Sequence, residues 1–284
     1  MFTDFVKSLF KKKNTGTKAM PDKLFNDLMT FAKTKEKPFL NIHEDMYVAG
    51  GFAVYLYSML NDTNTSRFIT TKDIDLTVPV RKNEEIEQVL KKFKNTLQKF
   101  CTQFEYDMND FKFHEHQFRT PVTMNKFRGV CNLKWVEISY KNSECFDFMF
   151  NKRLDKMKPN KGDSMKTGFP LQSIEWYIND IIIMFIKESL EGVDNFAFSK
   201  RNPFTGKFKL KGTKDFHRLK LMCRLSKSNM WCELSKKLEL NRSTNQSILL
   251  EMFAHLRHLY PRNMYCFRVL KELNENNKKA NVKN

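Results

Sequence analysis

The chain has 284 residues, of which 41% are hydrophobic, a proportion that suffices for a folded core and excludes an intrinsically disordered protein. It carries 50 Lys and Arg residues against 32 Asp and Glu residues, so its formal net charge is +18 at pH 7. An excess of this size favours polyanionic partners, with nucleic acid as the first candidate.

Several other classes of protein do not fit the sequence. The six cysteines are scattered without a C-x-x-C pair, which predicts neither a zinc site nor a disulfide framework. The longest unbroken apolar run covers residues 181–186 and is far shorter than the ~20 residues that cross a bilayer. No signal peptide is recognisable at the N-terminus. We therefore expect a soluble, cytoplasmic protein without a membrane span.

In chain order, the spacing of apolar residues predicts both helices and strands. A basic amphipathic helix at residues 2–10 is followed by a helix at 23–33 and an apolar strand at 46–49, which stops at Gly50-Gly51. The next elements are a helix, a polar loop, a strand and a long helix, at residues 52–60, 61–66, 73–78 and 86–104. Three further strands are predicted at residues 111–118, 133–140 and 145–150.

The second half of the chain has a different pattern. Residues 151–170 are rich in proline, glycine and lysine and are interpreted as a linker or exposed crossing. Strand signals cease beyond them, and helices are predicted at residues 171–190, 213–234 and 245–260. The polar and basic residues 274–284 are predicted to form a disordered tail. The fold class is therefore α+β, with a mixed β-sheet flanked by helices and a mainly α-helical domain after it.

Two aspartates mark the strand predicted at residues 73–78. Because side chains alternate along a strand, Asp73 and Asp75 project from one face while Ile74 and Leu76 point into the core. Two carboxylates on one face repel each other unless cations neutralise them, and oxygen ligands select hard metals such as Mg²⁺. The pair predicts a site for Mg²⁺, or Mn²⁺, that holds a nucleoside triphosphate.

A glycine pair lies one predicted helix before this strand. Gly50 and Gly51 lack a Cβ, so backbone N–H groups can approach a phosphate at a helix N-terminus, where the dipole favours anions. A Gly-Gly pair alone is usually an ordinary turn, and an Asp-x-Asp alone is usually a solvated strand edge. The ordered combination of the two is much more specific.

This combination resembles the signature of the nucleotidyltransferase superfamily, which includes poly(A) polymerases, CCA-adding enzymes and the polymerase beta-like fold. The segments that match are Val48 to Gly51 and Asp73 to Leu76. The 21 residues between Gly51 and Asp73 exceed the usual interval of the family, which we attribute to a loop insertion at residues 61–66. The resemblance implies in-line attack by a 3′ hydroxyl on the α-phosphorus, with two metal ions and departure of pyrophosphate.

A second segment, Lys211 to Leu219, resembles the Lys-Asp-x-x-Arg helix that many of these enzymes place against the triphosphate. Thr213 suits the N-cap position, and the basic residues fall on neighbouring turns as a cationic cluster. A solvated helix face is the alternative interpretation of this segment. The implied nucleotide-binding residues are Gly50, Gly51, Lys211, Lys214 and Arg218.

The family also has a third metal-binding carboxylate on a later strand, for which the sequence offers Asp147 and Glu137. In a hairpin, a loop with an even number of residues places these acids on opposite faces, whereas an odd number places them on the same face. Asp147 lies between two phenylalanines and fits the family pattern better, while Glu137 stays the alternative. The predicted catalytic and metal-binding set is therefore Asp73, Asp75 and Asp147.

Two histidines on the strand predicted at residues 111–118 are a weaker signal. His114 and His116 lie on the same side of that strand, but no further Cys or His stands at ligand spacing. We interpret them as surface or partly packed histidines.

The resemblance implies a template-independent RNA 3′ nucleotidyltransferase. A poly(A) polymerase that uses ATP, or another nucleoside triphosphate, is the first choice, and the residue usage is similar in style to poly(A) polymerases of large cytoplasmic DNA viruses. A homodimer or a processivity subunit is a candidate partner. The implied units are a helical extension, a catalytic domain, a helical nucleotide- and RNA-binding domain and a basic tail, at residues 1–40, 41–155, 156–273 and 274–284.

Two other functions stay open on the sequence alone. A nucleotidyltransferase that modifies a protein or a small molecule would need no basic groove. A catalytically inactive nucleotidyltransferase fold could serve as an RNA-binding or subunit-interaction module, although the retention of Asp73 and Asp75 argues against it.

Overall fold

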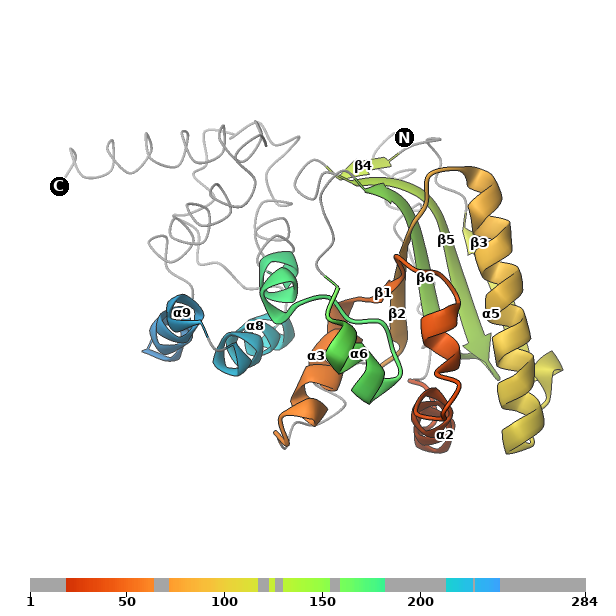
Figure 1. Cartoon of the computed structure of the whole chain (residues 1–284), viewed down its shortest axis with the longest axis horizontal. Helices are drawn as coiled ribbons and strands as arrows, with labels where there is room; N and C mark the ends of the chain where they lie inside the picture. The colour runs from red at the N-terminus through yellow and green to blue at the C-terminus, as the bar shows by residue number, and fades with distance from the viewer. Residues whose placement is uncertain are drawn as a thin grey trace, which may run out of the picture.

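A mixed β-sheet with helices packed around it forms the centre of the computed structural model (Figure 1). The structure describes residues 19–63, 72–116, 123–125, 130–153, 159–181, 213–226 and 228–240. The strands are β1 (Tyr47–Val48), β2 (Ile74–Pro79), β3 (Phe111–His116), β4 (Thr123–Asn125), β5 (Val130–Tyr140) and β6 (Ser143–Arg153). Their order is β1-β2-β6-β5-β3, with β4 paired to β5. β2 and β6 are parallel and the other pairs antiparallel, so the predicted α+β class with a mixed sheet is confirmed.

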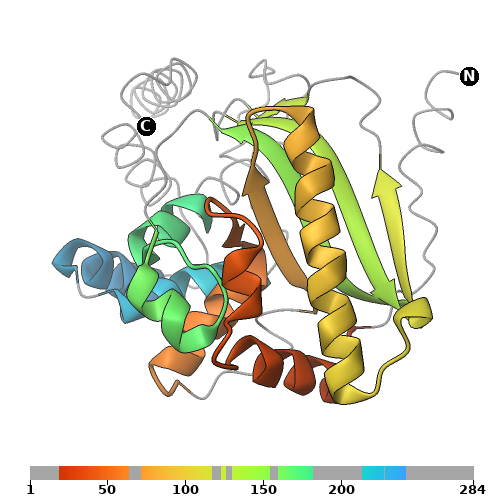
Figure 2. The ribbon, with the colours of Figure 1, turned by 45° about the vertical axis from the view of Figure 1, so that its right-hand side comes forward.

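Helix α5 (Asn83–Phe104) covers one face of this sheet, as Figure 2 shows. Its apolar stripe packs on alternate residues of β6: the ring centroid of Phe93 lies 5.0 Å from that of Phe146 and 4.7 Å from that of Phe148. Two acidic residues in the first turn, Glu84 and Glu85, complement the helix dipole. Because side chains alternate, the residues between these aromatic ones are directed to the opposite face.

Shorter helices within the described residues include α2 (Asp22–Ala32), α3 (Gly50–Leu60) and α6 (Lys161–Thr167). Two 3₁₀ turns, η1 (Pro38–Asn41) and η2 (Met108–Asp110), connect elements between them. The helices predicted at residues 23–33 and 52–60 are confirmed, but α3 begins at Gly50, so the glycine pair forms its first turn.

The linker predicted at residues 151–170 is wrong for the described part of that segment. β6 continues to Arg153, and α6 follows with a cap at each end. The Asn160 side chain accepts a hydrogen bond from the backbone N–H of Asp163 at 3.2 Å, and Gly168 ends the helix with a φ of 79°. These two capping residues stabilise a short helix in a stretch whose composition is typical of a loop.

Buried hydrogen bonds connect the segment after α6, which contains Gln172 and Tyr177, to β1 and α3. The Tyr177 hydroxyl donates to the carbonyl oxygen of Val48 at 2.8 Å, and the Tyr57 hydroxyl donates to that of Gln172 at 2.6 Å. Burial raises the pKa of both tyrosine hydroxyls well above their usual range, so both remain protonated donors at neutral pH. The predicted domain boundaries after residues 40, 155 and 273 stay predictions.

The described residues beyond 173 contain helices and no strand, in agreement with the predicted helical half. The single helix predicted at 213–234 is wrong, because two helices stand there, α8 (Thr213–Leu225) and α9 (Asn229–Leu240). Between them the Ser226 hydroxyl accepts a hydrogen bond from the backbone N–H of Ser228 at 3.2 Å, a local bond that competes with helical pairing. α8 packs against α3.

Other expectations concern parts of the chain that the structure does not describe. The segments predicted at residues 2–10, 245–260 and 274–284 lie outside the described residues. Within the described ranges, no helix has both the length and the apolar character that a bilayer crossing requires.

Gly168→Ala should destabilise the fold, because an added Cβ would collide with the backbone carbonyl of Ala32 at a positive φ. A strained residue of this kind costs on the order of 1–3 kcal/mol, so we expect the free energy of unfolding in urea to fall by at least ~1 kcal/mol. Gly162→Ala is the matched control, since a Cβ there meets only the Asn160 Oδ1 atom, at 3.9 Å. Equal stability of the two variants would contradict this packing.

Candidate metal centre

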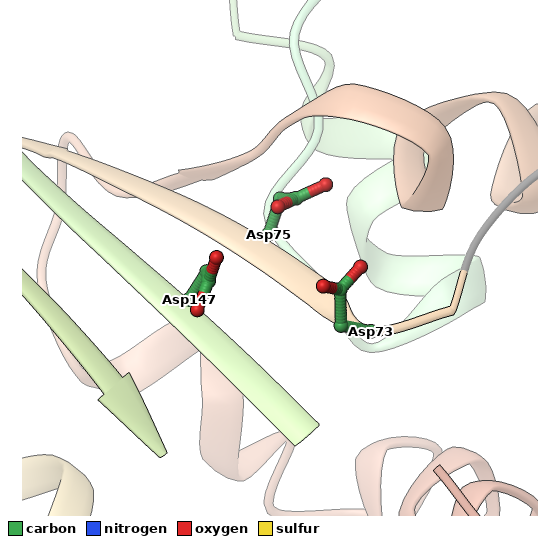
Figure 3. Close-up of side chains that lie close together, drawn as sticks. All are labelled: Asp73, Asp75 and Asp147. Carbon is green, nitrogen blue, oxygen red and sulfur yellow. The ribbon is translucent and has the colours of Figure 1, made fainter. Parts of the chain in front are cut away.

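Three aspartates from two neighbouring strands form a cluster of carboxylates. Asp73 directly precedes β2, Asp75 lies within β2 and Asp147 lies within β6. Each offers a carboxylate oxygen, and these oxygens all lie within 4.8 Å of one another. Figure 3 shows that the three side chains rise on the same side of the two strands. The residues that the sequence predicted as a metal-binding set are therefore brought together.

The pairing of β2 with β6 explains this convergence. Asp75 is the direct partner of Asp147 in the parallel register, and paired residues of adjacent strands share one face of a sheet. The residues on either side of Asp75, Ile74 and Leu76, are buried on the face that α5 covers. All three aspartates are half-buried, so they are close enough to interact in surroundings that screen charge less than water does.

The environment of Asp147 disfavours its negative charge. Burial, as the largest cause, and then the charges of Asp73, Glu137 and Glu144 together raise the pKa of this carboxyl to about 7. A hydrogen bond with Trp135 acts in the opposite direction. Because the strongest effects all oppose ionisation, a bound cation would relieve an unfavourable arrangement of charges.

The donor atoms of the cluster fit a hard divalent cation. The Asp147 Oδ1 atom is buried and has no hydrogen-bond partner among the described residues, so it is free to accept a cation. All three candidate ligands are carboxylate oxygens, which suit Mg²⁺ and Mn²⁺ and do not suit soft metals. Asp73, Asp75 and Asp147 are thus the residues that would hold the ion.

The carboxylate of Asp75 leaves no space for a Cβ atom at Gly50. This glycine is the first residue of α3 and has a φ of 54°, and a Cβ at this position would collide with the Asp75 Oδ2 atom and lie 3.1 Å from its Cγ atom. The backbone N–H of Ala49 also donates to the Asp75 carbonyl oxygen at 2.8 Å. The N-terminus of α3 therefore sits against the carboxylate cluster, where its dipole favours negative charge.

A β-bulge determines whether Glu137 and Asp147 lie on the same face of the sheet. The β5–β6 hairpin has a two-residue turn at Lys141 and Asn142, which by itself would put the two acids on opposite faces. The pairing shifts by one residue at Cys145, however, so Glu137 stands directly opposite Asp147 on the same face. Even so, the carboxylate cluster contains Asp147 and not Glu137.

Glu137 has a different partner. Its Oε2 atom lies 3.4 Å from the Nε2 atom of His116, whose ring stacks on Trp135 with 4.1 Å between ring centroids. The interpretation of His116 as a partly packed histidine thus misses a contact with residues beside the carboxylate cluster. The sequence carries no signal for this contact, because it depends on the register between β3 and β5.

The other predicted nucleotide-binding residues are placed in part. Gly51 is buried in the first turn of α3, next to Gly50. Lys214 and Arg218 lie in the first half of α8, the helix that packs against α3. Lys211 lies outside the described residues. Contact of any of these residues with a nucleotide stays a prediction.

Comparisons with known proteins add little to this geometry. No protein-family model and no curated protein sequence matches the chain. Among solved structures, the chain is similar to the crystal structure of the Megavirus polyadenylate synthase, with 12% sequence identity and a TM-score of 0.36. The match covers 65% of this chain and 33% of that protein, so it spans about a third of the other protein's length. A likeness of this size assigns no function.

Asp147→Asn should stabilise the metal-free protein at alkaline pH. The folded state binds a proton on Asp147 more tightly than the unfolded chain, because the pKa rises from 3.8 to about 7 on folding. Ionisation therefore lowers the free energy of unfolding as the pH rises from 3.8, and the loss is complete above about 7.

We expect the variant to melt a few degrees above the wild type at pH 8 in EDTA, and the difference to shrink toward pH 4. Asp110→Asn, which removes an ion pair with Lys141 at 3.0 Å, is the control and should not raise the melting temperature. A wild-type protein as stable as Asp147→Asn at pH 8 would show that the cluster carries no such cost.

Proposed function

We propose that this protein is a metal-dependent nucleotidyltransferase that adds nucleotides, first of all from ATP, to the 3′ end of RNA. The observation that carries the proposal is the set of three carboxylates at β2 and β6. Within the described residues the Asp147 Oδ1 atom is buried and has no hydrogen-bond partner, and Asp75 lies against the N-terminus of α3. Such a set suits two divalent ions in a phosphoryl or nucleotidyl transfer site. The +18 net charge supports a polyanionic acceptor.

Each part of the site has a task in this reaction. Asp73, Asp75 and Asp147 would hold two Mg²⁺ ions, which would supply charge stabilisation for an in-line displacement. The acceptor 3′ oxygen forms a bond to the α-phosphorus while the bond to the β-phosphate oxygen breaks, and pyrophosphate leaves. We assign the proton of the attacking hydroxyl to the Asp147 carboxylate, the role that the family resemblance gives to the third acid.

The remaining predicted residues are assigned to the triphosphate. Backbone N–H groups at Gly50 and Gly51 begin α3 beside the carboxylates and suit a phosphate contact. We propose that Lys211, Lys214 and Arg218 provide the cationic groups, since α8 packs against α3. No covalent intermediate with the protein is needed, so positioning and charge neutralisation account for the catalysis.

Asp75→Asn should reduce nucleotide transfer by on the order of a thousandfold or more, since it removes a charge that the metal ions require. The assay incubates the protein with a labelled RNA oligonucleotide, Mg²⁺ and each nucleoside triphosphate in turn. Asp110→Asn serves as the matched control, because its carboxylate pairs with Lys141 and not with the cluster. Wild-type turnover by Asp75→Asn would refute the site.

RNA binding by the wild type should be strongly salt-dependent. Binding to a single strand weakens with salt by ~0.7 in log K per log unit of salt for each phosphate contacted, because counterions are released. With about five contacts, a fourfold increase in salt should lower the affinity on the order of a hundredfold. Fluorescence anisotropy across that range measures this slope.

The combination of binding and transfer separates the candidate functions. Salt-sensitive binding together with Mg²⁺-dependent 3′ extension supports the proposal. Binding without extension by any nucleotide would instead indicate an inactive module. Absence of both would make a protein or a small molecule the leading acceptor.

A further inference from the structure

Two consecutive aromatic residues after α6 hold the two residues of β1. The Tyr47 ring contacts that of Trp176, with 4.9 Å between their centroids. The Val48 carbonyl oxygen accepts a hydrogen bond from the Tyr177 hydroxyl at 2.8 Å, and the Val48 N–H donates to the Pro170 carbonyl oxygen at 2.9 Å. Both backbone polar groups of Val48 are therefore bonded to the segment after α6, while β2 pairs with the other edge of β1.

The Tyr177 hydroxyl is itself held in place. It accepts a hydrogen bond from the backbone N–H of Gln172 at 3.2 Å and donates to Val48. The side chain is buried, so bulk water does not compete for these two bonds. A hydroxyl that accepts one bond and donates another has a defined orientation, and Tyr177 therefore fixes the carbonyl group of Val48.

The position of Val48 matters because the glycine turn follows it directly. Ala49 donates its backbone N–H to the Asp75 carbonyl oxygen at 2.8 Å, and Gly50 then begins α3. A Cβ at Gly50 would collide with the Asp75 carboxylate, so the N-terminus of α3 has almost no clearance from the cluster. Because β1 pairs with β2 through two residues, the bonds on its other edge contribute much of what holds this turn in place.

We propose that Tyr177 is a positioning residue for the N-terminal turn of α3. The proposal rests on the proposed function, which assigns this turn to the triphosphate. Through Val48, the Tyr177 hydroxyl sets the backbone N–H groups of Gly50 and Gly51 at a fixed place relative to the three aspartates. Misplacement of a binding group by about 1 Å can cost on the order of a hundredfold, so the loss of one distant hydrogen bond is measurable at the nucleotide.

Tyr177→Phe tests this role, because it removes the hydroxyl and keeps the ring that fills the buried site. Isothermal titration calorimetry of the full chain with ATP and Mg²⁺, without RNA as acceptor, should give a dissociation constant about tenfold higher than that of the wild type. Inorganic tripolyphosphate with Mg²⁺ should lose affinity by the same factor, because the affected contacts are to phosphate groups. The affinity for Mn²⁺ alone should stay that of the wild type, since β2 and β6 hold the three aspartates in register.

Tyr57→Phe is the matched control. Its hydroxyl is also buried and donates to the Gln172 carbonyl oxygen at 2.6 Å, so this change removes a bond between the same segment and α3 instead of β1. Both variants should melt below the wild type, but Tyr177→Phe should lose much more ATP affinity than Tyr57→Phe. Equal losses would show a general loosening of the segment and would overturn the positioning role.

A conservative replacement separates the hydrogen bond from the packing of the ring. Tyr177→4-aminophenylalanine keeps a donor that can reach the Val48 carbonyl oxygen, and it should restore most of the ATP affinity that Tyr177→Phe loses. Circular dichroism verifies that each variant is folded. A replacement that keeps the donor but binds ATP as weakly as Tyr177→Phe would also overturn the proposal.

The failure of the proposed function would look different. In that case the wild type itself would bind no ATP in the presence of Mg²⁺, which removes the nucleotide site and the role of Tyr177 with it. A wild type that binds ATP and extends RNA, beside a Tyr177→Phe variant with full ATP affinity, would overturn the positioning role alone.

Discussion

The parallel pairing of β2 with β6 is the constraint on which the whole site depends. It sets Asp75 opposite Asp147. The register is held by the neighbouring residues of both strands, whose side chains point to the opposite, apolar face of the sheet. A slip of one residue would turn Asp147 into the aromatic layer under α5 and expose Phe146 or Phe148. Burying a charge there without a partner would cost several kcal/mol. The apolar packing on one face of the strands therefore determines which residues lie on the polar face.

The cluster in turn has a cost that the rest of the fold must offset. The raised pKa of Asp147 means that its ionised form is disfavoured by burial and by its acidic neighbours. The N-terminus of α3 compensates in part, and it can approach Asp75 only because Gly50 has no Cβ. Natural proteins commonly carry local instability of this kind where function requires it.

Local patterns in the sequence predicted much of this arrangement, and tertiary pairing accounts for what they missed. Period-two alternation correctly placed Asp73 and Asp75 on one face, and apolar spacing predicted α5. The loop length was expected to decide whether Asp147 and Glu137 share a face, yet the bulge at Cys145 reversed that rule. The choice of Asp147 rested instead on its two flanking phenylalanines and the family pattern. Neither the bulge nor the contact of His116 with Glu137 leaves a periodic signal, because both depend on pairing between strands.

The carboxylate cluster is negatively charged, whereas the whole chain is positively charged. Under the proposed function, this contrast couples the binding of the metal to the binding of the triphosphate. Without a cation, Asp73, Asp75 and Asp147 repel the phosphates that the +18 chain attracts. Metal and triphosphate must therefore bind with positive coupling, since each relieves the repulsion that opposes the other. Partial burial strengthens every one of these interactions relative to an exposed surface. The burial that destabilises the metal-free cluster thereby increases its preference for a metal-loaded nucleotide over a bare one.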